Sequence, residues 1–243
     1  MTLNNTNRLR FDFIGMAFAL ALGQVGLEIG DFYSNNQSIF KHPYVFTQLL
    51  LGTYIIAASW VGWNKSASKG HLDPIVNTFG KPFVVLLLDL LMVICYFILV
   101  KGVEKPYLEE ELKISGLFEL FWSLVIIGLY FLWDIVTKLI NFNSEKFILK
   151  LDTKSFFARG YQAVICFVLL LIPFITIKYS IVADDNAVLI DIYILSVFIL
   201  FRGLKEDIKE SNKHKSVIAL KKILYIGIPI CSIMTLLLFI YFK

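Results

Sequence analysis

Long apolar stretches separated by short polar segments are the feature that most limits how this chain can fold. A helix needs about 20 mostly apolar residues to cross roughly 30 Å of hydrocarbon. Seven stretches have or approach that length: residues 11–30, 44–63, 82–100, 116–138, 156–177, 187–201 and 218–242. Because backbone groups in lipid must be hydrogen-bonded internally, these stretches predict transmembrane helices.

The composition agrees with a chain that lies in a membrane. Hydrophobic residues make up 58% of the 243 residues and charged residues 17%, whereas soluble domains carry about 25% charged residues. The apolar stretches do not alternate at every second residue, so they do not predict membrane β-strands. The longest polar segment, 202–217, is too short for a separate core. We therefore expect residues 1–243 to form one all-α integral-membrane domain, a polytopic helical bundle of about seven spans.

The distribution of basic residues predicts the orientation of the bundle. With seven spans and a cytoplasmic N-terminus, 17 of the 23 Lys and Arg residues lie on the cytoplasmic side, as the positive-inside rule requires. Removing a middle span would move every later loop across the membrane and spoil this bias. Ala17, Ala19 and Ala21 resemble a signal-peptide cleavage site, but apolar residues continue past them. We expect the first helix to be retained and the protein to lie in the plasma (inner) membrane.

Sequence motifs for catalysis are absent. The chain has no phosphate-binding glycine loop, no zinc-protease motif, no nucleophile elbow and no paired C-x-x-C. Its three histidines are isolated in polar segments, and its three cysteines fall in three different spans, as packing residues do. We expect no enzymatic activity, no metal or other cofactor, and no nucleic-acid partner.

Carboxylates within the spans are the first candidates for a functional site. An ionisable group at the centre of a span costs about 2.5–3.5 kcal/mol and needs a partner or water. Asp89 lies about 10 Å inside the third span at 1.5 Å per residue. Asp12 and Asp134 lie near the cytoplasmic ends of the first and fourth spans. These residues either form ion pairs that fix helix order or line a water-filled path.

The expected partners of these carboxylates are also at the cytoplasmic ends. Arg10, Arg159 and Arg202 are the candidate cations for ion pairs. Because groups near span ends are easily hydrated, ion pairing is favoured for Asp12 and Asp134, whereas Asp89 fits either interpretation. Trp60 and Trp63 end the second span and are typical of interface anchors.

The first span combines small and polar residues. Gly15, Ala19 and Gly23 have the small-xxx-small spacing that lets helices approach closely, within the bundle or in a homo-oligomer. Gln24 and Glu28 are four residues apart on another face, near the outer side. They either hydrogen-bond to a neighbouring helix or line a pore.

Charged residues elsewhere suggest two surfaces. Ten acidic residues fall on the outer side, Glu119 and Asp191 among them, and such a surface concentrates cations with or without a pore mouth. A juxtamembrane basic cluster on the cytoplasmic side can bind anionic lipid. Its members are Lys213, Lys215, Lys221 and Lys222.

Two functions remain compatible with these observations. The first is a small, oligomeric channel or transporter-like protein that moves ions or a small solute. The alternative is a non-conducting membrane partner whose basic cytoplasmic face binds a protein, a lipid or a nucleotide signal. A hydrated route from Asp89 to Gln24 and Glu28 would favour conduction, whereas a dry bundle with a salt-bridged Asp89 would favour the partner function.

Overall fold

The computed structural model describes residues 5–34, 42–68, 80–102, 116–143, 148–151, 161–179, 187–205 and 221–241. Most of them are helical. The helices are α1 (Asn5–Ser34), α2 (Pro43–Ser68), α3 (Lys81–Lys101), α5 (Leu117–Asp134), α7 (Tyr161–Lys178), α8 (Ala187–Lys205) and α10 (Ile228–Tyr241). Two π-helical turns, η2 (Ile135–Leu139) and η3 (Ile223–Gly227), follow α5 and precede α10. The expected all-α bundle is confirmed.

Among the described residues, six helices are long and apolar enough to cross a membrane, and they coincide with the first six predicted spans. The chain is therefore an integral membrane protein. The seventh predicted span corresponds to η3 and α10, whose apolar part, Ile223–Leu237, is shorter than the other six. Pro229, just after η3, has no N–H to donate, so one i→i−4 hydrogen bond of the helix is missing there. A seventh crossing stays a prediction.

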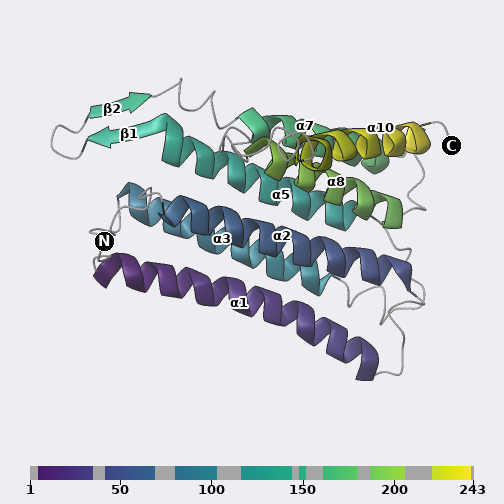
Figure 1. Cartoon of the computed structure of the whole chain (residues 1–243), viewed down its shortest axis with the longest axis horizontal. Helices are drawn as coiled ribbons and strands as arrows, with labels where there is room; N and C mark the ends of the chain where they lie inside the picture. Colours follow the sequence, from purple (N-terminus) through teal and green to yellow (C-terminus); the bar gives the residue numbers. More distant parts are fainter. Residues whose placement is uncertain are drawn as a thin grey trace.

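The helices pack in successive layers (Figure 1). Helix α1 contacts α2 and α3, which in turn contact α8 and α5, and α7 and α10 lie on the far side of α5 and α8. Consecutive helices run in opposite directions, so the starts of α1, α3 and α7 share one end of the bundle with the ends of α2, α5 and α8. We call this the hairpin end. In the predicted topology it is cytoplasmic.

A short β-hairpin lies beyond α5 at the hairpin end (Figure 1). Strands β1 (Ile140–Asn143) and β2 (Ile148–Leu151) are antiparallel, with Ile140 opposite Leu151. The sequence analysis had no element here between its fourth and fifth spans. The signal was present, because apolar Ile140 and Phe142 alternate with asparagines at the period of a strand.

The outward faces of the helices are as apolar as the interior. On α3, for example, Leu87, Leu91 and Ile94 are exposed, whereas Leu88 and Met92 are buried. A large exposed apolar surface is unfavourable in water and favourable against lipid tails. The burial of a side chain therefore does not correlate with its hydrophobicity in this chain. The buried polar residues are the exceptions in an otherwise apolar interior.

Candidate functional site

Asp89 is held between two tryptophans at the hairpin end. Its side chain on α3 is 1% exposed. The indole Nε1–H of Trp63 on α2 donates to Oδ2 at 3.2 Å, and that of Trp133 on α5 donates to Oδ1 at 3.1 Å. Each carboxylate oxygen thus accepts a neutral donor from a different helix, which helps to satisfy a carboxylate inside a span.

This arrangement changes the interpretation of the tryptophans that end α2. Trp63 was expected to anchor the helix at the lipid interface, but it is only 6% exposed because its indole is turned inward to Asp89. Trp60 is half-buried and stacks on Trp63, with ring centroids 5.7 Å apart and planes at 13°. Phe18 of α1 also contacts Trp60, with ring centroids 5.4 Å apart and planes tilted by 54°. The two tryptophans therefore take part in packing in the interior of the bundle.

The small residues of α1 divide between two environments. A Cβ added to Gly15 would lie 3.2 Å from the Trp60 ring, so this glycine allows α1 to approach α2. Ala19 is exposed, and nothing lies within 4 Å of a Cβ added to Gly23. The predicted stripe thus packs inside the bundle at one position and faces outward at the other two.

Three hydroxyl groups lie beside the Asp89 site, on the side towards the middle of the bundle. Ser59 on α2 is hydrogen-bonded to Tyr130 on α5, and Tyr130 is hydrogen-bonded to Tyr96 on α3 at 3.1 Å. Ser59 precedes Trp63 by one helical turn. Tyr96, Tyr130 and Trp133 were not predicted from the sequence, since an aromatic residue in an apolar helix gives no sign of the direction in which its side chain points.

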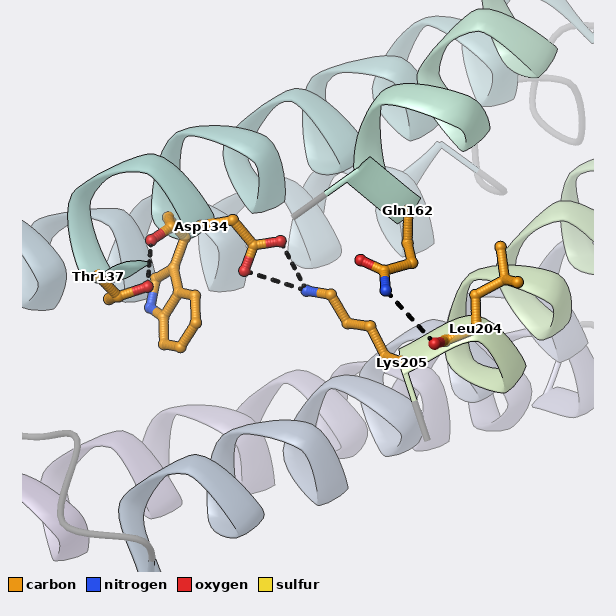
Figure 2. Close-up of polar contacts among 6 residues, drawn as sticks. Asp134, Thr137, Gln162, Leu204 and Lys205 are labelled. Carbon is orange, nitrogen blue, oxygen red and sulfur yellow. Dashed lines mark hydrogen bonds and ion pairs between the residues drawn. The ribbon is translucent and has the colours of Figure 1, made fainter. Parts of the chain in front are cut away.

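Asp134 is ion-paired with Lys205 across α5 and α8 (Figure 2). The Lys205 Nζ lies 3.4 Å from Oδ1 and 3.1 Å from Oδ2, and the carboxylate is fully buried. The same ammonium group lies 4.5 Å from the ring centroid of Phe201 and 5.4 Å from that of Tyr130, which adds cation–π contacts. The ion pair expected at Asp134 is thus present, with a lysine in place of an arginine.

Neighbouring backbone groups complete this corner of the bundle. Thr137 in η2 donates to the carbonyl of Trp133 at 2.6 Å, and Gln162 on α7 reaches the carbonyl of Leu204 at 3.4 Å (Figure 2). Lys81 at the start of α3 donates to the Thr137 carbonyl at 3.3 Å. Five helical segments therefore meet around Asp134 and Lys205.

The other cations predicted for this end are placed only in part. Arg202 is half-buried and packs against α2, where a Cβ added to Gly62 would lie 2.4 Å from its Nη1. Asp12 is exposed, as are Lys221 and Lys222 at the start of the last helix. Four of the predicted residues lie outside the part of the chain whose side chains are described: Arg10, Arg159, Lys213 and Lys215.

Gln24 and Glu28 lie together at the opposite end of the bundle. Gln24 donates to Glu28 at 2.5 Å, and Lys101 at the end of α3 lies 3.4 Å from the same carboxylate oxygen. Asp89 and Lys101 are twelve positions apart on α3, about 18 Å at 1.5 Å per residue. The structure therefore does not bring Asp89 together with Gln24 and Glu28.

Two further carboxylates, those of Asp191 and Glu119, lie near this opposite end, between α2, α5 and α8. Asp191 is 2% exposed and Glu119 is 7% exposed, and the two interact electrostatically. Thr47 donates to Asp191 Oδ2 at 2.7 Å. The sequence analysis assigned both carboxylates to the acidic outer surface, and this assignment is wrong because they face the interface between helices.

The part of the chain described by the structure contains no group of three or more His, Cys, Asp or Glu side chains that could hold a metal ion. No protein-family model, no curated protein and no solved structure matches this sequence.

Proposed function

We propose that this protein is a small channel or transporter that moves ions or a small solute across the membrane, with cations as its best substrate class. The observation that carries the proposal is the burial of Asp89 inside a span, where two indole N–H groups donate hydrogen bonds to its carboxylate. Ionisable residues in membrane helices are costly, and ion and substrate paths are among the roles for which they are retained.

The chemistry of the buried groups supports a cation. Buried carboxylates lie at both ends of the bundle, with Asp89 and Asp134 near the hairpin end and Glu119 and Asp191 near the other. Carboxylate and hydroxyl oxygens attract cations and repel anions. The hydroxyls of Ser59, Tyr130 and Tyr96 extend the polar surface from Asp89 towards the centre.

Flux measurements on the purified protein in proteoliposomes test the proposal. Wild-type protein should dissipate an imposed cation gradient faster than empty liposomes. Asp89→Asn should change that rate by tenfold or more while the protein still folds, since it removes a charge and keeps the side-chain shape. Asp12→Asn is the matched control, because Asp12 lies at the same end and is exposed. The proposal would be overturned if liposomes that contain the wild-type protein were no more permeable than empty ones to any cation, anion or small solute.

A non-conducting membrane partner is the second candidate function. The buried face of α3 between Asp89 and Lys101 is mostly apolar, with Met92, Val93 and Leu99 among its residues, as expected of a dry bundle. Exposed Lys221 and Lys222 would then bind a cytoplasmic protein or anionic lipid in the plasma membrane. Absence of flux, with binding to anionic vesicles that is lost in Lys221→Gln/Lys222→Gln, would favour this candidate.

A further inference from the structure

The buried carboxylates Asp191 and Glu119 lie where three helices meet. The Thr47 hydroxyl fixes Asp191 from α2 at 2.7 Å. The start of α5 packs closely against α8 beside Asp191. A Cβ added to Gly116 would lie only 2.4 Å from the Ile190 side chain. This close approach brings Glu119, in the first turn of α5, to the neighbourhood of Asp191, where the two groups interact electrostatically.

Two buried oxygen atoms here have no hydrogen-bond partner among the described residues. One is Asp191 Oδ1, on a side chain that is 2% exposed. The other is the hydroxyl of Ser123, which is fully buried and lies one helical turn from Glu119 on the same side of α5. A buried polar atom without a partner costs about 1–3 kcal/mol, so its retention calls for a ligand.

We propose that Asp191, Glu119, Ser123 and Thr47 form a binding site for an alkali metal cation of the size of Na⁺. Two carboxylates and two hydroxyls offer only oxygen ligands, which suit hard cations. Bound Na⁺ offsets the repulsion between the carboxylates and uses the two unpaired oxygens. The site deepens the proposed function by naming a cation that the protein binds near its outer end, and it rests on that function only for its role in transport.

Binding is measured without transport, on purified protein in detergent. A ligand that binds only the folded protein raises its melting temperature as concentration increases. NaCl should raise the melting temperature more than choline chloride at equal ionic strength, and LiCl and KCl rank the size preference. Asp191→Asn and Glu119→Gln should each raise the Na⁺ concentration for half of this shift by tenfold or more. Asp31→Asn is the control, since Asp31 is an exposed acid near the same end.

Milder variants keep the test decisive if the carboxylate variants do not fold. Ser123→Ala and Thr47→Val each remove one oxygen ligand and should weaken the response to Na⁺ several-fold, and Thr47→Ser should restore it. Equal melting temperatures in sodium and choline salts would overturn the site, as would a sodium effect that survives in Ser123→Ala and Asp191→Asn alike. A response to Ca²⁺ alone would also overturn it. Na⁺ binding without flux would instead refute the proposed transport while leaving the site intact.

Discussion

Individual polar residues in this protein are distinguished by the donors that surround them. Asp89 and Asp134 are both buried aspartates near the hairpin end, yet Asp89 accepts two neutral indole N–H groups and Asp134 faces an ammonium group. An ion pair between two helices fixes their order, and the two indole N–H groups fix the orientation of the Asp89 carboxylate. Asp89 carries the proposed function because it is buried farther inside its span than Asp134, which is the last residue of α5.

The two indole hydrogen bonds to Asp89 can be removed one at a time. Trp63→Phe and Trp133→Phe each keep an aromatic ring and lose the N–H donor. Hydrogen bonds between membrane helices contribute about 0.6 kcal/mol on average, and charged acceptors strengthen them, so we expect each variant to lose about 1–2 kcal/mol. Unfolding in mixed micelles measures the loss. In an Asp89→Asn background the same substitutions should cost less, and equal costs in both backgrounds would show that ring size alone matters.

The Lys205–Asp134 ion pair gives a prediction about the loss of a charged partner instead of a neutral donor. Lys205→Met keeps the apolar stem but removes the cation facing a fully buried carboxylate. We expect a loss of about 3–5 kcal/mol, as for other broken buried pairs. Asp134→Asn should recover most of the stability lost by Lys205→Met, because the unbalanced charge is then gone. A double variant as unstable as Lys205→Met would instead assign the loss to the contacts of Lys205 with Phe201 and Tyr130.

At the scale of elements, the glycines determine which helices can touch. Gly203 on α8 is buried, and an added Cβ would lie 2.3 Å from the carbonyl oxygen of Tyr225 in η3. Gly23 on α1 has nothing within 4 Å of the same position. Both are glycines in apolar helices, so their sequence neighbourhoods do not separate them. Their packing does.

These two glycines make a matched pair for substitution. Gly203→Ala should cost about 1–3 kcal/mol by forcing η3 away from α8. Gly23→Ala should be neutral or stabilising by up to about 1 kcal/mol, because alanine is the better helix former. Thermal unfolding compares the two. If the outward stripe of Ala19 and Gly23 mediates a homo-oligomer, Gly23→Ile should reduce the particle size by light scattering without lowering the stability of the monomer.

The whole molecule has a direction, because its helices alternate. Helix α1 begins at the hairpin end and α10 ends at the other (Figure 1). With the N-terminus on the cytoplasmic side, as the distribution of basic residues predicts, we expect Asp89 on the cytoplasmic side and Asp191 on the outer side.

Reporter fusions test this orientation. A reporter inserted between β1 and β2, after Asn143, should be cytoplasmic, and one joined at the C-terminus should be on the outer side. The reason is the positive-inside rule applied to seven crossings. Finding both reporters on the same side would mean that the last helix, the shortest of the apolar helices, does not cross.

The sequence was enough to predict membrane helices and the positions of six of them, because length and hydrophobicity are local properties. It also located Asp89, Asp134, Gln24 and Glu28 at the correct ends, since depth along a span follows from counting residues. Which helix faces meet could be seen only in the packed bundle. Lipid and protein interior are equally apolar, so hydrophobicity does not distinguish the buried side of a membrane helix from its exposed side. For that reason Trp133, Lys205 and the Asp191–Glu119 pair became visible only once the helices were packed.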